Sequence, residues 1–186
     1  MRIKIGVSNR HMHITKEVFN VLFGQAELVK AKDLVQPGEF ASTLKVTIKT
    51  EKDQIENVRV LGPFRDYTQV EISKTDSYKL GINPPIRNSG DLNNAEEITI
   101  IGSIGEIKKK CCIIATRHIH MTKEQRKDLG LSNVDYVSIQ LNGEKSSILK
   151  DVYIKECEKA VVQMHIDTDD ANSCFIKDGD FGELII

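Results

Sequence analysis

The chain has 186 residues, of which 40% are hydrophobic and 28% are charged, a composition typical of a globular protein. Its net charge is −1, with 26 Lys and Arg interspersed among 27 Asp and Glu, so nucleic acid is not an expected partner. No apolar run reaches the roughly 18 residues that a membrane-spanning helix needs, so no membrane association is expected either.

The first chemical signal is RHMHITKE at residues 10–17, which follows a predicted strand beginning at residue 2. Because residues i and i+2 of a strand point to the same face, His11 and His13 would present two imidazoles close enough to hold one metal ion. Thr15 is a good helix N-cap and Gly24 a good helix stop, so a short helix is predicted between them.

Period-two alternation of apolar and polar residues recurs along the rest of the chain. It predicts six strands, over residues 44–50, 57–62, 68–73, 97–102, 136–141 and 151–156. Gly38 and Gly179 mark turns, Asn142-Gly143 predicts a two-residue hairpin turn, and a closing strand is predicted to end at Ile186. Many short strands at this spacing indicate a mainly β fold, either barrels or a sandwich.

Two further candidates lie in residues 60–73, VLGPFRDYTQVEIS. Arg65 follows a Gly-Pro turn that can aim its guanidinium at an oxyanion. Glu71 lies on an alternating strand, and the residues alone allow two interpretations of it. It is either the solvent-facing side chain of an amphipathic strand or a metal ligand.

The octapeptide then returns as RHIHMTKE at residues 117–124, identical at six of eight positions and 107 residues later (118 − 11). His118 and His120 form a second pair, Thr122 and Gln125 predict a capping box, and Gly130 predicts the end of the helix. The repeat predicts two related halves joined near residues 104–116.

These two pairs contain four of the five histidines, and the fifth, His165, lies in another apolar run, which ends in acidic and turn residues. A catalytic zinc typically takes three protein ligands and leaves one position open. Each pair therefore needs a third ligand, for which His165 is one candidate and a carboxylate or cysteine the other. The cysteines lack CxxC spacing, which favours reduced thiols in a cytoplasmic protein: Cys111, Cys112, Cys157 and Cys174.

Six motifs taken together resemble the PduL-type phosphate acyltransferases, also called phosphotransacylases or phosphate propanoyltransferases. They run in order from residue 7 to residue 172: VSNRHMHIT, LVQPGEFA, RVLGPFRDYTQVEIS, GINPPIRNSGDL, TRHIHMT and MHIDTDDAN. The resemblance covers nearly the whole chain, and the set is far more specific than one His-x-His pair.

The resemblance implies two six-stranded β-barrels capped by short α-helices, with a dimetal site between them. Residues 1–7 and 116–186 would form one barrel, and residues 8–115 the other. It implies two divalent ions per chain, for which zinc is the expected metal. One ion would take His11, His13 and Glu71, and the other His118, His120 and His165.

The implied reaction is acyl-CoA + phosphate ⇌ acyl phosphate + CoA, by direct attack of phosphate on an acetyl or propanoyl thioester. Arg65 would bind phosphate, and five residues fall where such enzymes contact coenzyme A: Ser8, Lys32, Arg59, Leu61 and Asn172. The sequence departs from the family pattern at Glu39, where QPGQ is usual, and in NNAEE at 93–97. A homo-oligomer is compatible with the sequence.

Two other functions are also compatible with the histidine pairs. One is a metal-dependent hydrolase of thioesters or amides, because His-x-His also occurs in hydrolases. The other is a zinc-binding structural module, although structural sites are usually rich in cysteine and these cysteines lie outside the histidine clusters in the sequence. The early first strand leaves no room for a microcompartment-targeting helix, so a cytoplasmic enzyme is expected.

Overall fold

The computed structural model describes residues 1–24 and 27–185, so the predicted strand end at Ile186 lies outside the described residues. The chain divides into two compact units, one of Met1–Asn9 with Thr116–Ile186 and one of Arg10–Ala115. The first segment of the former unit ends at Asn9, directly after the first strand, which runs to Ser8.

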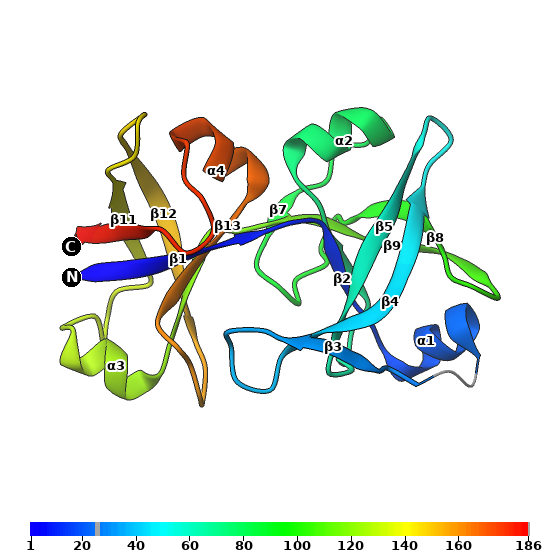
Figure 1. The fold of residues 1–186 in the computed structure, drawn as a ribbon, viewed down its shortest axis with the longest axis horizontal. Coiled ribbons are helices and arrows are strands. Elements are labelled where there is room, and N and C mark those ends of the chain that lie inside the picture. Colours follow the sequence, from blue (N-terminus) through cyan, green and yellow to red (C-terminus); the bar gives the residue numbers. More distant parts are fainter. Residues whose placement is uncertain (25–26, 186) are drawn as a thin grey trace. The chain divides into compact units, whose positions relative to one another are not determined.

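The unit that contains both chain termini is a closed six-stranded barrel (Figure 1). Its strand order is β1 (Arg2–Ser8), β13 (Gln163–Asp167), β10 (His118–Met121), β12 (Ser147–Glu156), β11 (Tyr136–Leu141) and β14 (Phe181–Ile185). Alternate residues of these strands fill its core, among them Ile5, Ile119 and Met164, which are fully buried. Helices α3 (Lys123–Asp128) and α4 (Thr168–Cys174) belong to this unit.

The central unit is also built on six strands that close, because β8 pairs with both β4 and β9. The ring is β4 (Phe40–Lys49), β5 (Gln54–Gly62), β2 (His11–His13), β6 (Gln69–Glu71), β9 (Glu106–Ala115) and β8 (Glu96–Ile101). Two short strands extend it, β3 (Lys30–Asp33) beside β4 and β7 (Ile86–Arg87) beside β9. Its helices are α1 (Lys16–Phe23) and α2 (Lys74–Leu80). The prediction of two six-stranded barrels with short helices is confirmed.

In each barrel, one strand comes from the segment of chain that directly precedes the histidine pair of the other barrel. β1 leads into the first pair, yet it pairs with β13 and β14 of the terminal barrel. β9 leads into the second pair, yet it pairs with β6 and β8 of the central barrel. When β1 is matched to β9, β10 to β2 and β13 to β6, the order of strands around the two barrels is the same.

The predicted helix boundaries are confirmed. The Thr15 hydroxyl accepts a hydrogen bond from the Val18 N–H, and Gly24 caps the C-terminus of α1. Thr122 and Gln125 form the predicted capping box of α3. In that helix the C-cap is Leu129, and Gly130 follows it at a φ of +71°.

The hairpin between β11 and β12 is confirmed, but the predicted two-residue turn is wrong. Leu141 pairs with Ser147, so the loop contains residues 142–146, and neither Asn142 nor Gly143 adopts a positive φ. The glycine serves packing here, because a Cβ at Gly143 would lie 2.7 Å from the carbonyl oxygen of Cys174. The predicted turns at Gly38 and Gly179 do have positive φ, +80° and +92°.

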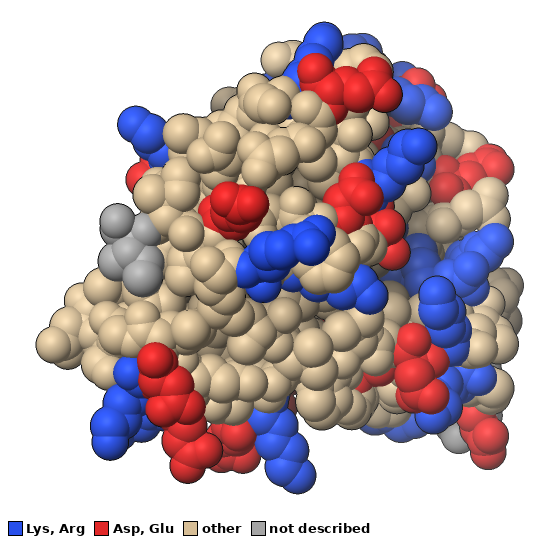
Figure 2. Space-filling model, turned by 60° about the vertical axis from the view of Figure 1, so that its left-hand side comes forward, with Lys and Arg blue, Asp and Glu red and all other residues tan. Residues whose placement is uncertain are grey.

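The surface charge agrees with the composition. On the face shown in Figure 2, basic side chains lie next to acidic ones, with no field of a single sign. Among the described residues, no helix is long and apolar enough to span a membrane.

Candidate metal centres

The first candidate metal site lies on the neighbouring antiparallel strands β2 and β6. Their register places His11 opposite Glu71 and His13 opposite Gln69, so all four side chains share one face. The residues between them point into the hydrophobic core. His11 Nε2 lies 3.4 Å from Glu71 Oε2, and His13 Nε2 lies 3.7 Å from Glu71 Oε1. Three donor atoms of three side chains therefore meet at one point.

Gln69 holds the Glu71 carboxylate in this position. Its Nε2 donates to Glu71 Oε1 at 2.7 Å and to Ser89 Oγ at 3.1 Å, while its Oε1 accepts from the Gly90 N–H at 2.8 Å. The Tyr67 hydroxyl in turn hydrogen-bonds Ser89 Oγ at 3.1 Å. Glu71 is buried, with 9% of its surface exposed, which excludes the solvent-facing interpretation of this residue.

The second candidate site has the same construction on β10 and β13. His118 stands opposite His165, and His120 stands opposite Gln163. The rings of His118 and His165 stack with centroids 5.2 Å apart, and the His120 ring lies edge-on to both. Each of the two sets brings three ligand atoms to within 4.8 Å of one another.

The donor atoms of the second set fit a zinc ion. His118 Nδ1 lies 2.8 Å from the Thr116 carbonyl oxygen, so this nitrogen carries the proton and Nε2 keeps its lone pair. The Nε2 atoms of His118 and His120 are 3.2 Å apart. A tetrahedral zinc with Zn–N bonds of about 2.0 Å holds its nitrogen ligands about 3.3 Å apart.

One cysteine belongs to this second site, so the expectation that all four lie outside the histidine clusters is wrong in space. Cys157 Sγ lies 3.4 Å from His120 Nδ1 and 3.6 Å from the Lys155 carbonyl oxygen. The contact arises because β10 and β12 run parallel, and the Cys157 N–H donates to the Met121 carbonyl oxygen at 2.9 Å. The thiol can thus orient the ring of His120.

The other three cysteines are buried in the hydrophobic cores. Burial raises the pKa of the Cys111 thiol to about 12 and that of Cys112 well above its usual range. Both lie in the core of the central barrel, and Cys174 is buried in the terminal one. The structure describes all four cysteines, and none of them forms a disulfide.

The arginine that opens each octapeptide forms a fork with an aspartate, which the sequence reading missed. Arg10 donates to Asp76 from Nε and Nη2, both at 2.8 Å. Arg117 donates to Asp170 in the same way, at 2.7 and 2.6 Å, and this hydrogen bonding raises the pKa of Arg117. Asp76 lies in the first turn of α2, and Asp170 in the first turn of α4.

These aspartates belong to a second repeated motif, 94 residues apart (165 − 71). QVEISKTD at 69–76 matches QMHIDTDD at 163–170 in the order glutamine, candidate metal ligand, isoleucine, N-cap and aspartate. Ser73 and Asp167 are the N-caps, and burial raises the pKa of Asp167. This spacing of 94 residues differs from the 107 residues that separate the octapeptides. The two repeats therefore do not align at one common spacing.

Arg65 lies close to the end of strand β2 in the chain fold. Its N–H donates to the carbonyl oxygen of Ile14, the residue that follows His13, at 3.0 Å. Its guanidinium pairs with Glu39, and both side chains are about three-quarters covered. Of the predicted coenzyme A residues, Arg59 pairs in register with His11, and Lys32 and Leu61 both pair with Ala41.

The two remaining predicted coenzyme A residues lie in the terminal barrel. Ser8 ends β1 opposite Asp167, and Asn172 lies on α4. The structure therefore groups three of the five residues on strands of the central barrel, and places Ser8 opposite the N-cap of α4 and Asn172 within that helix.

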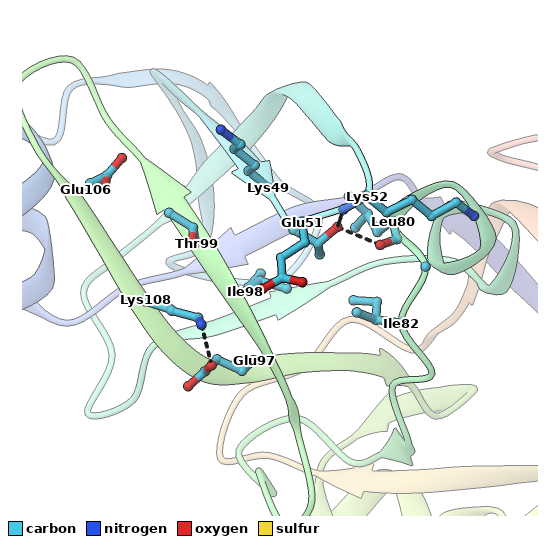
Figure 3. A pocket seen from close by; sticks show the side chains of 12 residues that line it. Lys49, Glu51, Lys52, Leu80, Ile82, Glu97, Ile98, Thr99, Glu106 and Lys108 are labelled. Atoms are coloured by element: carbon cyan, nitrogen blue, oxygen red, sulfur yellow. Dashed lines mark hydrogen bonds and ion pairs between the residues drawn. The ribbon is translucent and has the colours of Figure 1, made fainter.

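A separate hollow of about 810 Å³ opens on the central barrel, where β4, β8 and β9 meet the end of α2 (Figure 3). Three of its charged side chains already have partners, because Lys108 pairs with Glu97 at 3.0 Å and Lys52 donates to the Tyr78 carbonyl oxygen at 2.7 Å. The carboxylate raises the pKa of Lys108. None of its lining residues belongs to either ligand set, so it is not the candidate site.

Comparison with known proteins identifies the family of this chain. The family model described as phosphate propanoyltransferase matches residues 4–177. The chain is 49% identical to a phosphate propanoyltransferase of Priestia megaterium, over 98% of this chain and 85% of that protein. It is 46% identical to one of Thermotoga maritima, over 98% and 89%, and 42% identical to one of Rhodopseudomonas palustris, over 96% and 80%. The chain therefore belongs to the phosphate propanoyltransferase family of acyltransferases.

Proposed function

We propose that this protein transfers a propanoyl or acetyl group between coenzyme A and phosphate: acyl-CoA + phosphate ⇌ acyl phosphate + CoA. An oxygen of phosphate attacks the thioester carbonyl carbon, the carbon–sulfur bond breaks, and the sulfur leaves as a thiolate. The observation that supports this most is the pair of three-donor sets. Catalytic zinc sites use three protein ligands and keep one position open, whereas structural sites are closed by four.

We propose that His11, His13 and Glu71 hold one divalent ion, and that His118, His120 and His165 hold a second. Imidazole and carboxylate donors suit zinc. When bound, such ions would supply positive charge for the thioester oxygen and the departing sulfur. The proposal requires both ions to serve one substrate, as the resemblance implies.

The chain's own residues would bind and orient the two substrates. Arg65 would hold phosphate, because a guanidinium presents two parallel N–H donors that match two phosphate oxygens. Lys32, Arg59 and Leu61 would contact coenzyme A on the central barrel, and Ser8 and Asn172 on the terminal one. Orienting the phosphate oxygen at the carbonyl carbon lowers the entropic part of the barrier.

No cysteine carries the acyl group in this proposal. A thiol with a pKa of about 12, such as that of Cys111, holds almost no thiolate near neutral pH. Direct attack by phosphate needs no such nucleophile. We also propose a cytoplasmic location, because none of the four cysteines forms a disulfide and thiols stay reduced in that compartment.

Release of free thiol from propanoyl-CoA, measured with and without phosphate, separates the proposed reaction from its alternatives. The acyltransferase needs phosphate for thiol release. A hydrolase releases thiol without phosphate, and a structural zinc module releases none under either condition.

Arg65→Lys tests the phosphate residue. Lysine keeps the positive charge but loses the planar fork, so the KM for phosphate should rise about tenfold while the KM for propanoyl-CoA changes little. A rise confined to the KM for propanoyl-CoA would instead make Arg65 a coenzyme A residue.

A further inference from the structure

In two arginines of this protein, both donors on one edge of the guanidinium are hydrogen-bonded. Arg10 and Arg117 each donate from Nε and Nη2 to both oxygens of one aspartate, at 2.6 to 2.8 Å. In such a fork the planar edge of the guanidinium is satisfied, and no donor on that edge remains for a ligand.

In Arg65, by comparison, only one of the two donors on this edge of the guanidinium has an acceptor. Its Nη2 donates to one oxygen of Glu39, and its Nε is buried with no acceptor in hydrogen-bonding range among the described residues. A buried donor without an acceptor is costly, because it loses its hydrogen bonds to water without replacement. Two oxygens of one oxyanion would satisfy Nε and Nη2 together.

Backbone hydrogen bonds fix the turn that positions Glu39 beside Arg65. The Glu39 N–H donates to the Gln36 carbonyl oxygen at 3.1 Å, and the Glu39 carbonyl oxygen accepts from the Leu34 N–H at 3.0 Å. The next residue, Phe40, begins β4 opposite Gly62, the last residue of β5. A Cβ at Gly62 would lie 2.2 Å from the Phe40 ring, so the glycine allows the two strand ends to meet.

Arg65 is fixed on the other side of this junction, three residues after Gly62. Its N–H donates to Ile14, and its side chain is 29% exposed against 24% for Glu39. Both charges are therefore partly shielded from water and held by ordered backbone, and their attraction is less screened than that of a surface pair.

We infer that Glu39 is an internal competitor of phosphate at Arg65. Its carboxylate occupies the guanidinium when phosphate is absent, and phosphate must displace it in order to bind through Nη2 and Nε. Glu39 thereby sets the affinity for phosphate without taking part in the chemistry. The inference rests on the proposed function of Arg65.

Competition of this kind selects among anions. A phosphate dianion carries more charge than the carboxylate it displaces, whereas a monoanion such as formate or chloride does not. The pair therefore favours phosphate over small monoanions at Arg65. In the reverse direction the phosphoryl group of the acyl phosphate would meet the same carboxylate, so Glu39 also weakens the binding of that substrate.

The test is Glu39→Gln, which keeps the shape of the side chain and removes its charge. The KM for phosphate in thiol release from propanoyl-CoA should fall about three- to tenfold, and so should the phosphate Kd from calorimetry on zinc-loaded protein. The KM for propanoyl-CoA and the kcat should change less than twofold. Glu39→Asp keeps the charge and should stay nearer to the parent protein than Glu39→Gln.

Asp33→Asn is the matched control. Asp33 lies on the adjacent strand β3 opposite Phe40, is exposed, and pairs with Lys30 at 2.8 Å, so this variant makes the same change of charge without touching Arg65. Equal effects of Asp33→Asn and Glu39→Gln on the phosphate KM would reduce the result to long-range charge and overturn the inference.

A phosphate Kd that is unchanged or weaker in Glu39→Gln would also overturn it, since Glu39 would then orient Arg65 for phosphate. The proposed function fails separately, if the parent protein releases thiol without needing phosphate. In that case the ratio of the phosphate Kd values of the parent protein and Glu39→Gln still decides the role of Glu39. Absence of phosphate binding in both proteins would contradict the inference.

Discussion

The central and terminal barrels place a histidine pair and a candidate third ligand by the same strand register, yet this candidate ligand differs between the barrels. Glu71 stands opposite His11 in the central barrel, and His165 stands opposite His118 in the terminal one. A zinc bound by two imidazoles and a carboxylate would keep a net charge of about +1, and one bound by three imidazoles about +2. The scaffold is thus repeated while the electrostatics of the two sites diverge.

The surroundings of the two sets diverge as well. Gln69 donates to Glu71 and is held by Ser89 and Gly90. At the corresponding position of the terminal barrel, the Oε1 atom of Gln163 is buried with no hydrogen-bond partner among the described residues. The second set instead has Cys157 beside His120. Support from outside the ligand set is therefore specific to each barrel.

The largest effect is expected from removing the third ligand. Glu71→Ala and His165→Ala should each lower kcat/KM for propanoyl-CoA about a thousandfold, because each loses a ligand of an ion proposed to supply several kcal/mol. Glu97→Ala, an exposed carboxylate of the central barrel, is the control and should retain activity. Full activity in either ligand variant would leave its barrel without a catalytic role.

The aspartate forks should differ in their contribution to stability. Asp76→Ala removes both the fork with Arg10 and a capping box, and should lower the free energy of unfolding by about 2–3 kcal/mol. Asp170→Ala removes a more exposed fork and should cost about 1–2 kcal/mol. Denaturant unfolding measures both losses. The control is Asp91→Ala, which removes a more exposed ion pair with Arg87 and should lower the free energy of unfolding by less than about 0.5 kcal/mol. The reverse order of the two forks would contradict the account.

The corresponding glutamines should separate the two metal sites. Gln69→Ala should weaken zinc binding at the first set about tenfold, because Glu71 loses the group that orients it. Gln163→Ala should weaken the second set less than threefold, since no hydrogen bond of its Oε1 atom is lost. Competition with a chelator gives both affinities, and equal losses would show that the two barrels rely on the glutamine alike.

The smallest effect is expected at Cys157. The thiol is a weak hydrogen-bonding partner, so Cys157→Ala should weaken zinc binding only at the second set, by about two- to fivefold. Cys174→Ala, which removes a buried thiol of the same barrel, should leave zinc affinity unchanged. A loss at the first set in Cys157→Ala would rule out this local role.

The sequence predicted most features that depend on local chemistry. The histidine pairs, the threonine N-caps and the six strands follow from spacing and alternation, which the backbone obeys directly. Glu71 did not follow from spacing, because an acidic residue between Val70 and Ile72 also suits a strand with one solvated face. Its assignment needed the family resemblance, and the structure shows that the carboxylate is buried.

Features that depend on strand pairing escaped prediction. Cys157 reaches His120 only because β10 and β12 run side by side, and Arg10 reaches Asp76 across 66 residues of chain. The Asn142-Gly143 turn was wrong because β12 pairs from Ser147, which leaves five residues in the loop. Local turn preference did not determine the register there.

Zinc content per chain tests the central claim most directly, namely that each barrel holds its own ion. Elemental analysis of the purified parent protein should give two zinc ions per chain. The double variants His11→Ala with His13→Ala and His118→Ala with His120→Ala should give one each, and the combination of all four substitutions none. A folded double variant that still holds two ions, or a parent protein that holds only one, would contradict the two-site account.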